Sequence, residues 1–227
     1  MKKITLIILI HCLIFFVPYS KADDITDIKT QITALSNNLG NFPAHFKDIK
    51  EEAKVAKQYN ALKKQLDSLL KKQPDNQELL FYRGKLQVMG HNADYKNAWQ
   101  GATDDLTKLL ELNPSNVPAL LLLGAHWVNS EIGLAPKAEK LFLAAQCFQG
   151  TEPLEEAQRG LFFALYYQGK IKEATEQAQF LYTHWANESA YKQIYDMALG
   201  VLSKKSPDQA KQLEKNTPKS QMDCETK

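Results

Sequence analysis

The residue types that most often catalyse reactions or bind metals are present in this 227-residue chain, but they are far apart. Metal sites and acid–base pairs need such side chains at short, defined spacings, because the side chains must reach the same atom. Neighbouring carboxylates such as Glu155 and Glu156 diverge on a helix and favour a solvated surface. Nucleophile elbows, zinc-protease helices and phosphate-binding glycine loops are missing from the sequence. The sequence therefore predicts a protein that is not an enzyme and that holds no metal or cofactor. The histidines beyond residue 22 are His45, His91, His126 and His184.

Two cysteines lie beyond residue 22, Cys147 and Cys224. An oxidising compartment would allow one disulfide between them. Cys147, however, falls in an apolar helical stretch, where small buried thiols are common, and Cys224 falls in a polar tail. Neither cysteine belongs to a Cys-x-x-Cys pair, so a redox role is not expected. We expect two unpaired thiols rather than a disulfide.

The first 22 residues have the features of a signal peptide. Lys2 and Lys3 precede an apolar run over residues 4–17, and small residues at Ser20 and Ala22 suit a signal peptidase. The run is shorter than the roughly 20 residues that span a bilayer. We expect cleavage after Ala22, a periplasmic location and no membrane span afterwards. An uncleaved membrane anchor and secretion beyond the periplasm are the alternatives.

Removal of residues 1–22 changes the charge of the chain. The segment holds three lysines and no acidic residue, so the net charge falls from +2 to −1. A balance this close to neutral argues against nucleic acid as a partner.

The remaining sequence alternates apolar stretches of helical periodicity with short turns that contain proline, glycine or asparagine. Sustained apolar–polar alternation is missing, so strands are not expected. In residues 23–43 an apolar stripe, spaced as in a coiled coil, either packs on the next helix or drives self-association. Residues 203–227 are lysine-rich and predict a disordered tail, with at most a frayed helix near 209–215. The expected helices cover about 25–39, 44–72, 77–89, 95–112, 117–130, 136–148, 154–168, 171–185 and 188–202.

A pattern of small and large residues returns every 36 residues. Ala102, Leu106 and Leu109 recur as Ala138, Phe142 and Ala145, and again as Ala174, Ala178 and Leu181. Small side chains let neighbouring helices approach, and large ones fill the space beside them. Repetition at this period is typical of a solenoid in which each unit covers the open face of the next.

These repeats resemble the tetratricopeptide repeat (TPR) family. Leu120, Leu123, Gly124 and Trp127 match its first-helix positions, and Asn113-Pro114 matches its closing proline. The resemblance covers about Leu62 to Leu202 and implies an all-α, right-handed solenoid of antiparallel helical hairpins with an N-terminal helical pair. We expect residues 23–43 to form an N-terminal amphipathic helix and turn, and residues 44–202 to form the repeat domain. About six extra residues near 91–98 depart from the family pattern.

The resemblance also implies a concave groove, lined by first-helix side chains, that binds a protein or peptide. Some of these side chains, such as Phe81, Leu121 and Phe163, could instead belong to the core. We expect a binding scaffold in envelope assembly or maturation. The alternatives are an oligomeric adaptor that uses the first helix, a secreted factor, and an enzyme acting on envelope material, for which no residue set can be named. The expected groove residues are Phe81, Lys85, Met89, Leu121, Ala125, Asn129, Arg159, Phe163, Tyr166 and Tyr167.

Overall fold

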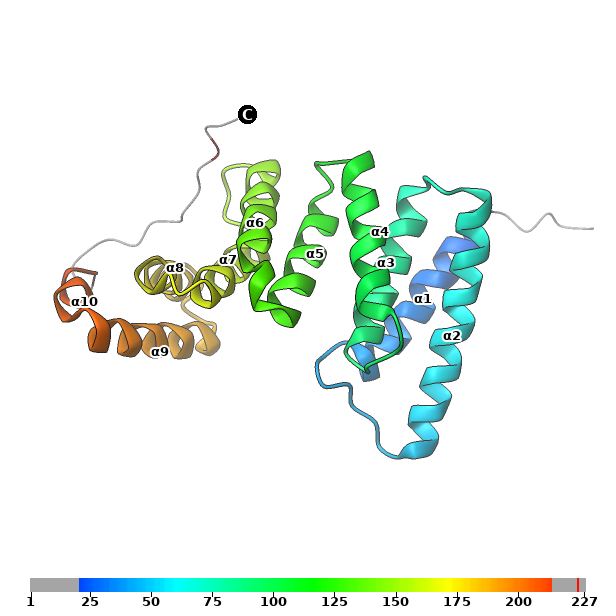
Figure 1. Cartoon of the computed structure of the whole chain (residues 1–227), viewed down its shortest axis with the longest axis horizontal. Coiled ribbons are helices and arrows are strands. Elements are labelled where there is room, and N and C mark those ends of the chain that lie inside the picture. Colours follow the sequence, from blue (N-terminus) through cyan, green and yellow to red (C-terminus); the bar gives the residue numbers. More distant parts are fainter. Residues whose placement is uncertain (1–20, 214–223, 225–227) are drawn as a thin grey trace, which may run out of the picture.

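A computed structural model describes residues 21–213 and residue 224 (Figure 1). The expected signal peptide, except for its last two residues, lies outside the described residues, as does most of the expected tail. The described part contains α-helices and one short 3₁₀ turn, and no strand, which confirms the all-α class. The helices are α1 (Lys21–Leu39), α2 (Ile49–Lys72), α3 (Gln77–His91), α4 (Ala98–Leu112), α5 (Val117–Ser130), α6 (Ala135–Gln149), α7 (Glu155–Tyr167), α8 (Ile171–His184), α9 (Ser189–Lys205) and α10 (Pro207–Leu213).

Two helices begin later than the apolar pattern suggests. Helix α2 begins at Ile49, because the Asp48 carboxylate accepts a hydrogen bond from the Glu51 backbone N–H at 2.8 Å and caps the helix there. Helix α4 begins at Ala98, because Asn97 adopts a left-handed backbone conformation with φ of 60°. In both cases a polar residue sets the helix start, which apolar spacing alone does not reveal.

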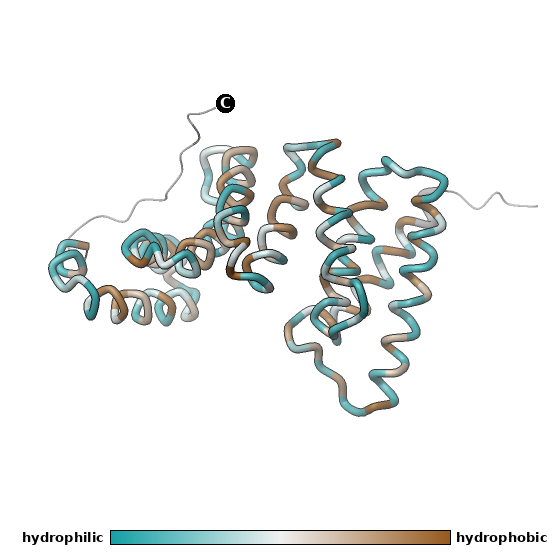
Figure 2. Tube along the Cα trace, viewed as in Figure 1, coloured by the Kyte–Doolittle hydropathy of each residue, from teal (hydrophilic) through white to brown (hydrophobic). Residues whose placement is uncertain are grey.

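Helices that follow one another in the sequence pack together, and so do α1 with α3, α3 with α5, and α5 with α7 (Figure 1). Helix α2 is polar along most of its length in Figure 2, and its apolar face turns inward. That face buries Val55, Tyr59, Leu62, Leu66 and Leu70.

The apolar stripe of the first helix is buried in the core of the same chain. Ile28, Ile32, Leu35 and Leu39 are at most 4% exposed and share one core with residues of α2 and α3. The stripe therefore packs on neighbouring helices, and self-association through it would require α1 to leave its core.

Phe142 of α6 determines how closely α5, α6 and α7 approach. A Cβ added to Gly124 of α5 would lie 2.9 Å from the Phe142 ring, and one added to Gly160 of α7 would lie 2.3 Å from it. Neither position has room for a methyl group. The ring, 2% exposed, thus fills the space that two glycines leave open.

Buried glutamines also join α6, α7 and α8. Gln146 of α6 accepts a hydrogen bond from Gln158 Nε2 of α7 at 2.8 Å, and Gln158 Oε1 accepts one from Gln177 Nε2 of α8 at 2.8 Å. All three side chains are at most 1% exposed. A buried polar chain of this kind favours one register of α6, α7 and α8 over its alternatives.

The C-terminal end is more ordered than the lysine content suggests. The expected boundary at residue 202 is wrong, because α9 continues to Lys205 and α10 follows it. Leu202, Ala210 and Leu213 are buried together, and Gln179 of α8 donates a hydrogen bond to the Leu213 carbonyl at 3.3 Å. Three apolar positions thus anchor a segment that is otherwise polar.

The expectation of unpaired thiols is also wrong. Cys147 and Cys224 form a disulfide across 77 positions of sequence, with their Cα atoms 5.5 Å apart. Within the apolar stretch, Ala145 and Gln146 take the buried positions, which leaves Cys147 half-buried on α6. The thiol is therefore accessible to a partner from the C-terminal segment.

The Phe142 contact predicts the effect of a single methyl group. Gly160→Ala should lower the free energy of unfolding by about 1–3 kcal/mol, because the new Cβ collides with the buried ring. Gly200→Ala is the matched control: it also lies within a helix, and its Cβ would meet no atom within 4 Å. The control should be neutral or slightly stabilising. Urea unfolding measures the free energy of unfolding of each variant. Equal values for the two variants would contradict the tight packing around Phe142.

Candidate functional site

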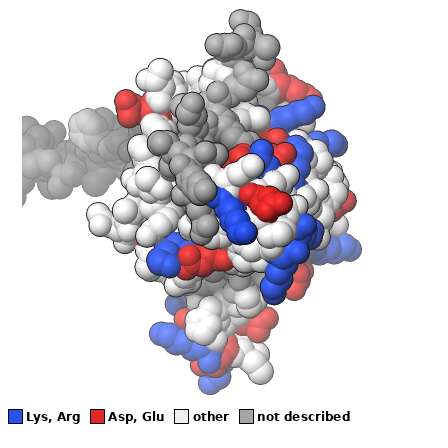
Figure 3. Space-filling view, turned by 90° about the vertical axis from the view of Figure 1, so that its left-hand side faces the viewer, with Lys and Arg blue, Asp and Glu red and all other residues white. Residues whose placement is uncertain are grey.

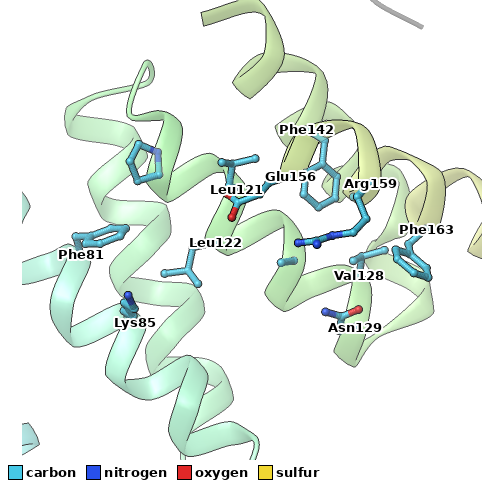
Figure 4. Close-up of a pocket in the computed structure, with 13 residues that line it drawn as sticks. Phe81, Lys85, Leu121, Leu122, Val128, Asn129, Phe142, Glu156, Arg159 and Phe163 are labelled. Carbon is cyan, nitrogen blue, oxygen red and sulfur yellow. The ribbon is translucent and has the colours of Figure 1, made fainter. Parts of the chain in front are cut away.

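A cavity of about 420 Å³ lies between α3, α5 and α7 (Figure 4). Leu121 and Leu122 of α5 form its middle, and Phe142 of α6 lies to one side of them, beside Arg159. Helix α3 contributes Phe81 and Lys85. Helix α7 contributes Glu156, Arg159 and Phe163. The cavity thus has an apolar centre between two walls that each carry a phenyl ring and a cation.

Seven of the ten expected groove residues line this cavity, and the other three do not. Met89 is 5% exposed and belongs to the N-terminal core. Tyr166 packs on the core around Phe162. Tyr167 is 39% exposed and lies outside the cavity, in the last turn of α7. The seven lining residues are Phe81, Lys85, Leu121, Ala125, Asn129, Arg159 and Phe163.

A second cavity of about 730 Å³ continues the first toward the N-terminal helices. The two cavities share Leu122, Ala125 and Asn129, so together they form one groove across α5. The far end is lined by residues 40–42 and by the turn after α3. We use the term groove for these two cavities together.

Sequence reasoning missed the far end of the groove. The loop after α1 reaches α3 through long-range hydrogen bonds: the Ala44 N–H donates to the Asn92 carbonyl at 3.0 Å, and Asn92 Nδ2 donates to the Leu39 carbonyl at 2.8 Å. Residues 92 and 39 are 53 positions apart, and no local pattern predicts such a contact. The extra residues near 91–98, noted above as a departure, were the one available signal.

Two basic residues of α3 have different roles. Arg83 donates to both oxygens of Asp105, at 2.8 and 2.6 Å, and to Asp67 at 2.8 Å, so it links α2, α3 and α4. Lys85 is half-buried at the groove, and within the described residues it has no ion-pair partner. Arg83 therefore stabilises the fold, whereas the Lys85 ammonium remains available to a ligand.

The surface formed by α8, α9 and α10 carries charged side chains of both signs (Figure 3). Figure 3 looks onto this end, where basic and acidic side chains are interspersed over the visible face. The ion pairs Lys172–Glu176 and Lys192–Asp196 belong to these helices. Among the described residues that Figure 3 shows on this face, charges of the two signs are mixed and do not form a single-sign patch of the kind that attracts polyanions.

A hydrogen-bonded unit of α4 and α5 supports the wall of the second cavity. His126 Nε2 lies 3.1 Å from the Trp99 carbonyl, so this nitrogen carries a proton and donates. Trp99 Nε1 donates in turn to Ser130 Oγ at 2.9 Å. Burial lowers the pKa of His126 from 6.5 to about 4, although the hydrogen bond to Trp99 opposes the shift. The imidazole is therefore neutral at neutral pH.

Comparisons of the chain with family models, curated proteins and solved structures found no match. The described helices include none that is both long and apolar enough to cross a membrane. A search of the described residues for three or more His, Cys, Asp or Glu side chains able to hold a metal ion found no such group.

The lowered pKa of His126 predicts acid sensitivity. Its folded-state pKa lies below the unfolded value of 6.5, so the unfolded chain binds this proton more readily. The contribution of the neutral His126 side chain to the free energy of unfolding is therefore present above pH 6.5. It is lost as the pH falls toward 4, by up to about 3 kcal/mol. His126→Gln should flatten the dependence of unfolding free energy on pH in this window, relative to the unmodified chain. His45→Gln, at an exposed loop residue, should keep the original slope. Identical slopes for all three proteins would contradict the assignment.

Proposed function

We propose that this chain is a TPR-like binding scaffold, built as a right-handed solenoid of antiparallel helical hairpins. Packing of α1 on α3, α3 on α5 and α5 on α7 supports one row of helices, with α2, α4, α6 and α8 behind it. Close contacts at the small repeat positions support the same arrangement, since a Cβ on Gly84 would meet Leu106 at 2.8 Å. In such a solenoid the row of first helices faces the groove.

The observation that carries the function is the continuous groove across α3, α5 and α7. Apolar and aromatic side chains such as Leu121, Phe81 and Phe163 can bury the apolar side chains of a partner. Lys85 and Arg159, from opposite walls, favour a partner that also carries a carboxylate. Glu156, beside Arg159, disfavours a second carboxylate at that wall. We infer that the ligand is an apolar peptide segment or helix with an acidic side chain.

Two features support an exported protein that acts in the cell envelope. The N-terminal residues have signal-peptide character, and the Cys147–Cys224 disulfide is of the kind that forms and persists in oxidising compartments. A periplasmic location, with a role in envelope assembly or maturation, is therefore the proposed setting. Secretion beyond the periplasm fits the same two features.

The surface proposed for self-association in an oligomeric adaptor is not exposed in the folded chain. The stripe that would drive self-association, including Ile28 and Ile32, is buried against α2 and α3. Recognition, not catalysis, is the chemistry that we propose for the first cavity, because its ionisable side chains, Lys85, Glu156 and Arg159, form no nucleophile–base pair.

Charge reversal at the groove tests this function. Lys85→Glu with Arg159→Glu should weaken capture of an envelope protein at least about tenfold, because charged and aromatic anchors in a groove carry most of the affinity. The bait is the chain from Asp23 onward, and captured proteins from an envelope extract are identified by mass spectrometry.

The matched control is Lys64→Glu with Lys140→Glu, two exposed lysines of α2 and α6 outside both cavities. It carries the same charge change and should capture normally, and both variants should retain the helicity of the unmodified chain. Equal capture by the groove variant and the control would move the interaction to another surface.

A further inference from the structure

We propose that the Cys147–Cys224 disulfide is a redox-sensitive clasp that holds the α7 wall of the groove in place, and that a dithiol reductant releases it. The proposal rests on the proposed function only for its consequence for binding. The mechanical part rests on how the helices are connected.

The structure divides into two parts that meet at α7. Helices α1 to α6 pack on one another, and α8, α9 and α10 form a second group. Within the described residues, the packing between the two groups runs mainly through α7, which contacts α5 and α6 on one side and α8 on the other (Figure 1). Any motion of the second group therefore acts first on α7.

The groove lies across this junction. Leu121 and Lys85 belong to the first group, whereas Arg159 and Phe163 are on α7 itself. A shift of α7 relative to α5 would change the width of the groove (Figure 4). Noncovalent contacts resist that shift at Gly160, which touches the Phe142 ring, and at Glu139 of α6, which pairs with Lys170 at 2.8 Å.

The disulfide closes a covalent ring around the junction. Cys147 is on α6, in the first group, and the loop to Cys224 contains α7, α8, α9 and α10. Helix α10 is itself fixed to the second group through buried Leu213 and its hydrogen bond from Gln179 of α8. The covalent ring therefore includes both a helix packed beside α8 and Cys147 on α6. Closing a loop of 77 positions removes many open conformations of the enclosed helices.

The sulfur atoms are accessible to exchange. Cys224 is exposed and Cys147 is half-buried. A thiolate of a dithiol attacks one sulfur, forms a mixed disulfide and expels the other cysteine as a thiolate. The second thiol of the reductant then displaces the bound cysteine. The dithiol loses two electrons and becomes a disulfide, and Cys147 and Cys224 become thiols.

Hydrogen exchange on the chain from Asp23 onward, without a partner, tests the clasp. After dithiothreitol treatment, amides of α7 to α10 should exchange at least about tenfold faster, whereas amides of α2 to α4 should be unchanged. Cys224→Ser removes an exposed side chain, so the fold should form without the clasp. This variant should match the reduced chain and should not respond to dithiothreitol.

Two results would overturn the clasp. One is an unchanged exchange pattern after reduction that mass spectrometry shows to be complete. The other is an acceleration spread equally over α2 to α4.

Binding separates this proposal from the proposed function. With a partner in hand, reduction and Cys224→Ser should each weaken capture, whereas reversal of the groove charges weakens it with the disulfide intact. Faster exchange with undiminished capture would overturn the link between clasp and groove. If only the charge-reversal test fails, the proposed function is contradicted. The clasp is then still supported by the hydrogen-exchange result.

Discussion

The structure depends on the close approach of α5, α6 and α7 around the Phe142 ring. Gly124 and Gly160 have no room for a side chain, so the ring contacts the helix backbone on both sides. The same ring lines the first cavity together with Leu121 and Leu122. The packing of the core and the proposed binding site therefore share one contact: the distance that lets α5 and α7 bury Phe142 also sets the width of the cavity that the ring lines.

Contacts between polar side chains determine which charged groups are left to interact with a ligand. Arg83 is engaged by Asp67 and Asp105, and the buried glutamines of α6, α7 and α8 engage one another. Burial raises the pKa of Asp105, and the hydrogen bonds from Arg83 oppose that shift. A charge held this way contributes to the specificity of the fold rather than to ligand binding. Lys85, two residues further along α3, lies on the cavity side and has no such partner in the described chain. The contrast between these neighbours distinguishes a structural cation from one that can meet a ligand.

Local patterns predicted the features that depend on local forces. The helix from Val117 to Ser130 begins and ends as expected, because an asparagine cap and apolar spacing both lie within it or beside it. The groove residues were expected from the resemblance to the TPR family, and the structure places Leu121 and Arg159 at the same cavity. The features that were missed depend on distant residues. The disulfide needs the folded chain to bring residue 224 to α6, and the far end of the groove needs residues 40–42 to return to the turn after α3. The buried face of α10 consists of two apolar side chains in a lysine-rich context, which is too short for periodicity to reveal.

Site-specific photo-cross-linking in the cell envelope is the measurement that tests the central claim most directly. A photoreactive phenylalanine analogue at Leu121 places the probe in the groove, and the same analogue at Ile49, which is 82% exposed at the start of α2, places it on an accessible apolar site away from the groove. A groove that binds a partner predicts a defined protein adduct from position 121 and none from position 49. An adduct from position 49 alone, or the same adducts from both positions, would contradict it.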